Sequence, residues 1–241
     1  MGDEKIPFTE HLEELRKRII ICFIAIGIGF AVCYSFAERI YLVLAKPLQQ
    51  ALPSDSSLIF TSPTEAFLTY LKTAFISGLF LAIPVILYQI WKFVAPGLYK
   101  NEAKYVVPFV ISSSILFIGG ALFGYLIVFP LGFKFLMSFT SESILALPSM
   151  REYFNFVTKL LLAFGLVFET PIFILFLTRM NIVTHQMLSR QRKYFILVAF
   201  VLGAVLTPPD VVTQTLMAVP LVILYELSVL IARIFAKKPT V

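Results

Sequence analysis

Charged residues are scarce in this sequence. Asp, Glu, Lys and Arg make up 14% of the 241 residues, whereas soluble domains carry about a quarter. Hydrophobic residues make up 59%, and the mean hydropathy is +0.90. A water-soluble protein of this size could not hide so much apolar surface, because much of its exterior must face water. The composition therefore excludes a soluble globular domain and indicates a chain that lies in lipid.

Residues that build metal, redox and hydrolytic sites are also few. The chain has two histidines and two cysteines. Cys22 and Cys33 lie in the same apolar run, so in a helix they are roughly 16 Å apart and cannot form a disulfide. The sequence contains no Gly-rich phosphate loop and no HExxH or GxSxG motif. We therefore expect no enzymatic activity, no cofactor and no metal.

Six apolar runs are expected to cross the membrane as helices, which makes the fold an all-α integral membrane protein. They are Ile19–Phe36, Phe67–Trp91, Tyr105–Pro130, Phe154–Leu177, Tyr194–Thr207 and Thr213–Ala232. The first run follows a polar segment and precedes no A-x-A-like cleavage site, so it is expected to be retained. The fifth reaches only about 21 Å, against a hydrocarbon core of about 30 Å. Because only residues 208–212 separate the fifth run from the sixth, these two helices should pack as a hairpin.

Lys and Arg gather in alternate connecting segments. Most of the 20 lie in residues 1–18, 92–104, 178–193 and 233–241, beside the apolar runs. This distribution sets topology in membranes, so the net charge of +6 does not indicate nucleic-acid binding. Positive residues stay in the cytoplasm. We therefore expect both termini there, including a tail of residues 1–18, with loops 37–66 and 131–153 outside.

Prolines and glycines interrupt the predicted helices. The prolines within them are Pro84, Pro108, Pro130, Pro171 and Pro220. Proline frees a carbonyl one turn earlier and bends a helix, and Gly120 and Gly124 are spaced for a close contact within the chain. We expect one transmembrane domain, residues 1–241, built as a concave bundle of kinked helices. The two halves share no repeat, which counts against an inverted-repeat transporter.

Glu169 is the deepest carboxylate of the predicted spans. A charge is costly in the apolar zone, so this side chain should face protein or water. One interpretation is structural: Glu169 bonds the backbone that Pro171 frees. The other is functional: Glu169 makes a polar contact with a partner helix or a substrate. Glu226, in the last span, is expected to reach the cytoplasmic boundary or to pair there, two turns from Arg233.

The predicted cytoplasmic face carries a second group of carboxylates. Thr9 could cap a short amphipathic helix lying on the membrane, in which Glu14 and Arg18 are one turn apart. The loop from Trp91 to Glu102 places a carboxylate beside aromatic and leucine side chains. A peptide with arginines and an apolar stretch would suit this surface, because guanidinium pairs bidentately with carboxylate. Alternatively, these carboxylates are solvated charges at helix ends.

Several segments together resemble the TatC family, the multispanning receptor subunit of the twin-arginine protein translocase. The resemblance runs from Phe8 to about Ile231. It rests on His11-Leu12-x-Glu14-Leu15-Arg16-x-Arg18, Ser62-Pro63-Thr64-Glu65, the stretch from Pro84 to Trp91, then Phe93, Ala95-Pro96, Leu98-Tyr99 and Glu102, Phe164-Gly165 with Phe168-Glu169-x-Pro171, Arg192-Lys193-Tyr194, and Leu206-Thr207-Pro208-Pro209-Asp210 with Gln214.

The resemblance implies a function that spacing alone does not show. Family members bind signal peptides with paired arginines on folded cargo, work with single-span TatA- and TatB-like partners in a multimeric complex, and use the proton-motive force. By position, the resemblance implies that Glu14 and Glu102 bind the arginines and that Arg16, Phe93 and Leu98 shape that surface. It also implies that Glu169 is the intramembrane polar contact, and that Pro47 and Asp210 belong to the outer cap and hairpin.

Two other functions remain open from the residues alone. One is a proton-coupled small-solute secondary transporter that uses Glu169, and the other is a membrane scaffold. A solute carrier usually shows repeats and several converging polar groups, whereas these spans hold one deep carboxylate. The lack of a transit peptide favours a bacterial cytoplasmic membrane for this multi-pass chain.

Overall fold

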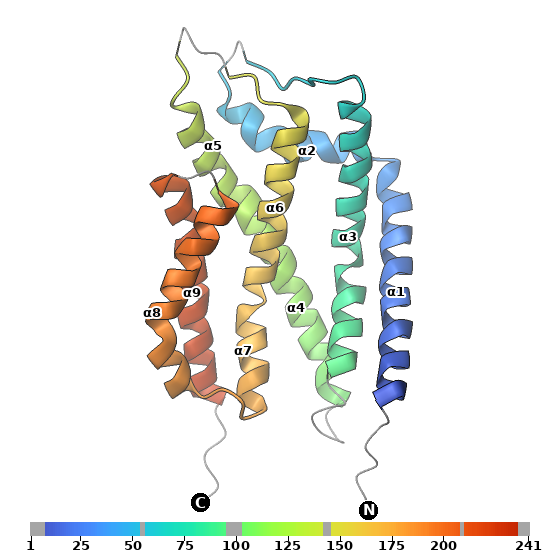
Figure 1. Cartoon of the computed structure of the whole chain (residues 1–241), viewed down its shortest axis with the longest axis vertical. Helices are drawn as coiled ribbons and strands as arrows, with labels where there is room; N and C mark the ends of the chain where they lie inside the picture. Colours follow the sequence, from blue (N-terminus) through green and yellow to red (C-terminus); the bar gives the residue numbers. More distant parts are fainter. Residues whose placement is uncertain (1–7, 54–55, 95–102, 142–145, 208–209, 236–241) are drawn as a thin grey trace, which may run out of the picture. The chain divides into compact units, whose positions relative to one another are not determined.

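The described part of the chain folds almost entirely into helices (Figure 1). The computed structural model describes residues 8–53, 56–94, 103–141, 146–207 and 210–235. The elements are α1 (Phe8–Tyr34), α2 (Ala37–Ala51), α3 (Glu65–Val94), α4 (Ala103–Phe123), the π-helical turn η2 (Gly124–Val128), α5 (Phe129–Met137), α6 (Met150–Phe168), α7 (Thr170–Arg179), α8 (His185–Leu206) and α9 (Val211–Phe235). The prediction of an all-α membrane protein is therefore confirmed.

Five helical segments are long and apolar enough to cross a bilayer, among the residues that the structure describes. They are Leu12–Tyr34, Glu65–Val94, Val106–Met137, Met150–Arg179 and Val211–Ile234. Each contains most of one predicted run, but the predicted fifth span does not qualify. Helix α8 begins with a basic stretch that includes Arg190, Arg192 and Lys193. Its apolar remainder reaches only roughly 20 Å at about 1.5 Å per residue.

The separate N-terminal surface helix predicted from the sequence is not found in the described residues. The sequence suggested a tail of residues 1–18 holding a separate surface helix capped by Thr9. Instead, α1 runs without a break from Phe8 to Tyr34, and Thr9 lies inside it. No Gly or Pro interrupts its first two turns, so nothing in the backbone ends the helix at the membrane boundary.

The loop predicted over residues 37–66 contains helix α2. Tyr41, Ala45 and Leu48 are buried at helical spacing on one face of α2, and this period was present in the sequence. The helix was predicted as a loop because of Pro47, since a proline in a helix interior is normally disruptive. Helix α3 begins at Glu65, directly after Ser62-Pro63-Thr64, and Ser or Thr beside a Pro is typical of a helix start.

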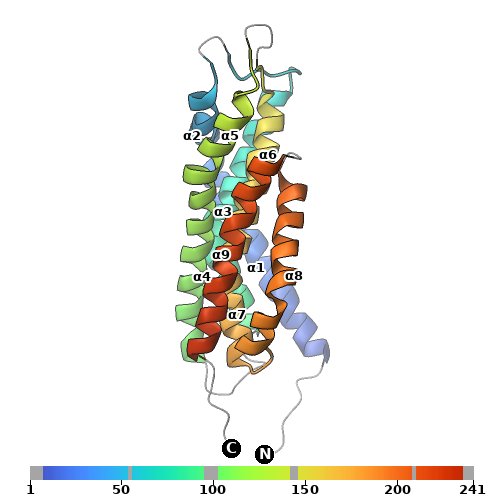
Figure 2. The same ribbon diagram turned by 90° about the vertical axis from the view of Figure 1, so that its left-hand side faces the viewer.

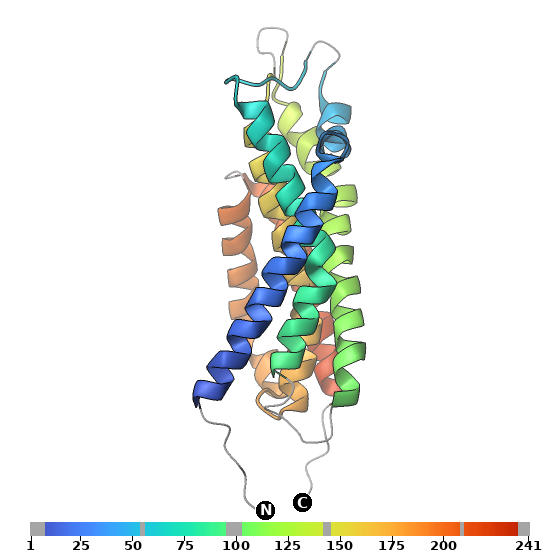
Figure 3. The same ribbon diagram turned by 90° about the vertical axis from the view of Figure 1, so that its right-hand side faces the viewer.

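The described residues belong to two compact units, Met1–Ile40 with Tyr70–Ser114, and Tyr41–Thr69 with Ile115–Val241. In the first unit α1 crosses α3 (Figure 3). Gly29 and Gly78 face each other so closely that a Cβ added to Gly29 would lie 2.5 Å from the Gly78 carbonyl oxygen. Small residues permit this backbone approach, which apolar helices in lipid use for packing.

In the second unit α6 and α9 both contribute fully buried side chains, and Val157 and Phe164 of α6 are both 0% exposed. A Cβ added to Gly120 or Gly124 would collide with Phe164. The predicted intrachain contact of these two glycines is therefore confirmed. Helices α8 and α9 pack side by side as an antiparallel hairpin (Figure 2). The Phe195 and Tyr225 rings stack between them at a centroid distance of 4.0 Å.

Candidate functional site

Arg18 joins the first turns of α1 to the last turns of α3. Its guanidinium donates from Nε to Glu14 Oε1 over 3.2 Å and also from Nη2 to the same oxygen. Nη1 donates to Gln89 Oε1 over 3.2 Å, and Nη2 to the Lys92 carbonyl over 3.3 Å. Because Arg18 is only 9% exposed, its charge is stabilised by these acceptors rather than by water. The predicted Glu14–Arg18 pair is confirmed, whereas its anchoring to α3 was not foreseen.

Glu14 keeps capacity for a second cation. Both hydrogen bonds that Arg18 donates to it end on Oε1, and an ionised carboxylate offers about four acceptor positions. The Glu14 side chain is 39% exposed, so an incoming group can reach it. Arg18 holds this carboxylate next to the end of α3, which removes part of the ordering cost of binding a guanidinium.

The structure describes only some of the other residues that were predicted for this site. Arg16 is exposed on α1, and Phe93 is half-buried in the last turn of α3, directly after Lys92. Leu98 and Glu102 lie outside the described residues. The structure thus brings the ends of α1 and α3 together around Glu14, Arg18 and Gln89.

Glu169 stands at the break between α6 and α7. It ends α6 and precedes the first residue of α7, and its Oε1 atom is buried. Pro171 has no N–H, so the carbonyl of Val167 loses its usual helical donor. The Thr170 hydroxyl donates to that carbonyl over 2.6 Å. The structural interpretation assigned the compensating hydrogen bond to Glu169. Thr170 supplies at least part of this compensation instead.

Pro47 lies buried inside α2. A proline here leaves the Val43 carbonyl without its helical donor. The Tyr125 hydroxyl, from η2, donates to that carbonyl over 2.6 Å. The Tyr153 hydroxyl, from α6, donates to the next carbonyl, that of Leu44, over 2.5 Å. Pro47 thus leaves the Val43 carbonyl available to the Tyr125 hydroxyl, and this hydrogen bond links α2 to the rest of its unit.

Asp210 caps α9 at the turn between α8 and α9. Its Oδ1 accepts from the Thr213 backbone N–H over 2.7 Å, and its Oδ2 accepts from the Thr213 hydroxyl. Gln214 donates from Nε2 to the Phe200 carbonyl of α8 over 3.0 Å. A cap of this kind satisfies backbone donors that a helix start leaves open. Together these bonds set the angle at which the hairpin turns.

Glu65 is a polar centre that sequence reasoning missed. Only 2% of this residue is exposed. One carboxylate oxygen accepts from the Ser149 hydroxyl over 2.6 Å and from the Arg151 N–H over 2.9 Å. The other accepts from the N–H and the hydroxyl of Thr61, each over 2.7 Å. These contacts could not be predicted, because nothing local in the sequence shows that residues 149–151 lie beside Glu65.

Glu226 forms an ion pair, and its partner lies on another helix. Its Oε2 lies 2.9 Å from Arg192 Nη2, across the hairpin in α8. Arg233, the basic residue nearest to Glu226 along α9, lies two turns further on. Sequence spacing shows only neighbours on the same helix, so this cross-helix pair could not be foreseen.

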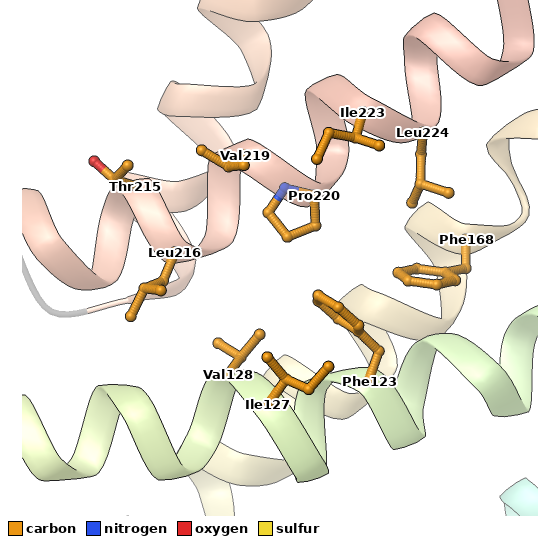
Figure 4. A pocket seen from close by; sticks show the side chains of 10 residues that line it. All are labelled: Phe123, Ile127, Val128, Phe168, Thr215, Leu216, Val219, Pro220, Ile223 and Leu224. Carbon is orange, nitrogen blue, oxygen red and sulfur yellow. The ribbon is translucent and has the colours of Figure 1, made fainter.

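An apolar pocket of about 480 Å³ lies between η2, the end of α6 and α9 (Figure 4). Its lining is Phe123, Ile127, Val128, Phe168, Thr215, Leu216, Val219, Pro220, Ile223 and Leu224. Thr215 is the one residue of this lining with a hydroxyl group. Such a surface suits lipid chains or apolar helix faces and offers little to a hydrated solute. Within the described part of the chain, no three His, Cys, Asp or Glu residues are grouped as a metal site would require.

Known proteins resemble this chain over almost its whole length. A family model described as Sec-independent protein translocase protein (TatC) matches residues 10–220. The Sec-independent protein translocase protein TatC of Desulforapulum autotrophicum is 51% identical over 98% of this chain and 87% of its own length. The protein of the same name from Aquifex aeolicus is 43% identical over 97% of both chains. That of Escherichia coli is 43% identical over 96% of this chain and 90% of its own.

The fold agrees with solved structures as well. A crystal structure of a twin-arginine translocase receptor, TatC, is 43% identical, covers 94% of this chain and 99% of its own, and superposes with a TM-score of 0.83. A second structure of such a receptor, in DDM, gives a TM-score of 0.82 at 42% identity over 92% of this chain and 99% of its own. On the family match, the identities and the shared fold, this chain belongs to the TatC family of Sec-independent protein translocase proteins.

Proposed function

We propose that this chain is the receptor subunit of a twin-arginine translocase. It binds signal peptides with paired arginines on folded cargo and takes part in moving that cargo across the membrane, driven by the proton-motive force. The observation that carries the proposal is Glu14, a half-exposed carboxylate that already binds one guanidinium and keeps acceptor capacity for another. The names of the relatives, which are translocase components rather than enzymes, support it.

The recognition surface combines charge with apolar contacts. Glu14 binds one arginine, and Glu102 supplies the second carboxylate. Phe93, at the end of α3, and Leu98 pack against the apolar part of the peptide, while exposed Arg16 repels wrongly placed positive charge. Arginine suits this surface better than lysine, because its planar fork can bond both oxygens of one carboxylate.

Orientation follows from the distribution of basic residues. The ends of α1, α3, α7 and α8 that carry Lys and Arg face the cytoplasm, and both termini lie there. The chain is then a multi-pass protein of a bacterial cytoplasmic membrane. Arriving signal peptides meet the Glu14 end of α1 from the cytoplasm.

Partner subunits bind within the membrane. Glu169 is the polar contact for single-span proteins of the TatA and TatB kind, because its buried oxygen lies where α6 gives way to α7. Hydrogen bonds between helices at membrane depth contribute roughly 0.6–2 kcal/mol each. The apolar pocket of Figure 4 argues against the small-solute transporter, since a hydrated solute would lose its water there with little replacement.

The site is tested by binding a labelled twin-arginine signal peptide to the purified protein in detergent. Glu14→Gln and Glu102→Gln should each weaken binding about 10- to 150-fold, because each removes a charge-assisted hydrogen bond of roughly 1.5–3 kcal/mol. Glu13→Gln is the matched control. Glu13 lies on the same helix, is exposed, and pairs with Lys17 over 2.9 Å.

A peptide with two lysines in place of the arginines should bind the unchanged protein weakly and lose little more in the Glu14→Gln and Glu102→Gln proteins. Equal binding by all the variants and the unchanged protein would refute the proposed arginine site.

A further inference from the structure

A second pocket, of about 620 Å³, opens between α8 and α9 where α8 begins and α9 ends. It differs from the pocket of Figure 4 because charged and apolar side chains line it together. The lining consists of His185, Ser189, Arg192, Val222, Ile223, Glu226, Leu227, Val229, Leu230 and Arg233. None of the residues predicted from the sequence to bind cargo is among them.

The charges of this pocket leave an excess of positive charge at its mouth. Arg192 and Glu226 form an ion pair over 2.9 Å and so compensate each other. Arg233 is exposed in the last turn of α9, about 10 Å along the helix from Glu226, and it forms no ion pair with any other described residue. His185 is the first residue of α8, where free backbone N–H groups give a helix its positive end. An anion is therefore favoured between Arg233 and His185.

The wall of the pocket is apolar and continuous with the lipid-facing surface. Ile223, Leu227 and Leu230 follow one another at helical spacing on α9 and are 55%, 48% and 52% exposed. This stripe runs from the charged mouth toward the middle of the membrane. Leucine and isoleucine exposed at this depth contact hydrocarbon chains, because no water is present there.

We propose that this pocket binds an anionic phospholipid. Its phosphate lies between Arg233 and His185 at the start of α8, and one acyl chain lies along Ile223, Leu227 and Leu230. Basic pockets at the ends of membrane helices bind anionic head groups for this reason. Free phosphate would use the cations but not the leucines, and a zwitterionic lipid would gain less from the excess charge. The proposal does not depend on cargo recognition.

The test is native mass spectrometry of the purified full chain in detergent, with phosphatidylglycerol or phosphatidylcholine of equal chain length added. The unchanged protein should retain phosphatidylglycerol in clear preference. Arg233→Gln should lower that retention about fivefold, as expected for one cation near a lipid surface. Arg190→Gln is the matched control, because Arg190 is exposed on the same hairpin but does not line the pocket. Its retention should stay unchanged.

Leu230→Asn tests the apolar wall of the pocket without changing its charge. It also allows the proposal to be refuted if Arg233→Gln does not fold. It should lower phosphatidylglycerol retention, and inorganic phosphate at the same concentration should not displace the lipid. Equal losses in Arg233→Gln and Arg190→Gln would overturn the proposal, as would displacement by inorganic phosphate. A photocrosslinker at residue 227 that captures a protein helix in membranes, and no lipid, would also overturn it.

Discussion

Two prolines remove a backbone hydrogen bond from helices of this chain, and a side-chain hydroxyl takes each released carbonyl. Tyr125 bonds the carbonyl that Pro47 releases, and Thr170 bonds the one that Pro171 releases. Pro171 lies in a membrane-spanning segment, where an unsatisfied carbonyl costs several kcal/mol because no water can replace the missing donor. The two sites differ in how far the donor lies from the carbonyl along the sequence. Thr170 acts within its own turn, whereas Tyr125 connects two elements that are far apart in sequence.

Tyr125→Phe tests this long-range repair. It removes one hydrogen bond to the Val43 carbonyl and should lower the free energy of unfolding by about 0.5–1.5 kcal/mol. The measurement is unfolding of the purified protein in mixed micelles with increasing denaturing detergent. Tyr34→Phe is the control, because Tyr34 is exposed at the end of α1, and its midpoint should not move.

A double substitution tests whether the Tyr125 hydroxyl acts by replacing the donor that Pro47 lacks. Pro47→Ala restores an N–H that can bond the Val43 carbonyl within α2, so Tyr125→Phe should cost less in that background than alone. Equal costs in both backgrounds would show that the hydroxyl does not act by replacing the proline's missing donor.

At the scale of elements, helices in this chain approach each other through glycines. Gly29 of α1 meets Gly78 of α3, and Gly120 and Gly124 lie against Phe164 of α6. Lipid provides no hydrophobic drive between helices, so close packing of small residues must stabilise the contact. Elements at the α2 end of the second unit are joined by polar groups instead. There Glu65 holds Thr61, Ser149 and the Arg151 backbone, and Ile59 bridges to Ser149.

Gly29→Ala should disrupt the crossing of α1 and α3. The added Cβ would lie 2.5 Å from the Gly78 carbonyl oxygen, which is backbone and cannot rotate away. Overpacking of this kind costs about 1–3 kcal/mol, and the same unfolding assay measures it. Gly27→Ala is the control on the same helix, since a Cβ there meets nothing within 4 Å. A Gly29→Ala protein as stable as Gly27→Ala would contradict the close contact.

At the scale of the whole molecule, the polar groups with a proposed role belong to different elements. Glu14 and Arg18 lie near the start of α1, Glu169 lies within the apolar length of the α6–α7 span, and Arg233 lies at the end of α9. This separation lets cargo recognition, partner contact and lipid binding be changed one at a time. Glu169 is the member whose proposed effect should appear in transport rather than in peptide binding.

Glu169→Ala should fold but impair export of a folded reporter that carries a twin-arginine signal. Losing a hydrogen bond to a charged group costs about 1.5–3 kcal/mol, which lowers partner affinity roughly 10-fold or more. Glu169→Gln keeps a hydrogen-bonding group and should retain more of the assembled complex, measured by co-purification of the single-span partners. Glu152→Gln, exposed in the first turn of α6, is the control and should export normally.

Signal-peptide binding should stay unchanged in both Glu169 variants, which separates partner contact from cargo recognition. If Glu169→Ala and Glu169→Gln both export normally, Glu169 serves the break between α6 and α7 and nothing more.

Sequence by itself determined the membrane character, five of the spans, the pairing of Glu14 with Arg18 and the family. These depend on composition, on long apolar runs, on one-turn spacing and on several family motifs, all of which are local in the chain. The predicted fifth span, Tyr194–Thr207, is not among those five spans: the sequence already showed it to be short, and the basic residues that precede it in α8 do not extend its apolar length. Helix α2 was missed, because a buried proline with a remote hydroxyl partner looks, from sequence, like a loop residue.

Only the tertiary structure decided which distant groups meet. Arg18 with Gln89, Glu65 with Ser149, and Arg192 with Glu226 each join elements whose proximity no local pattern encodes. Their positions follow from how apolar helices pack and where their ends then fall. A buried polar group needs a hydrogen-bond partner. In a folded chain that partner is the group nearest to it in space, which can be far away along the sequence.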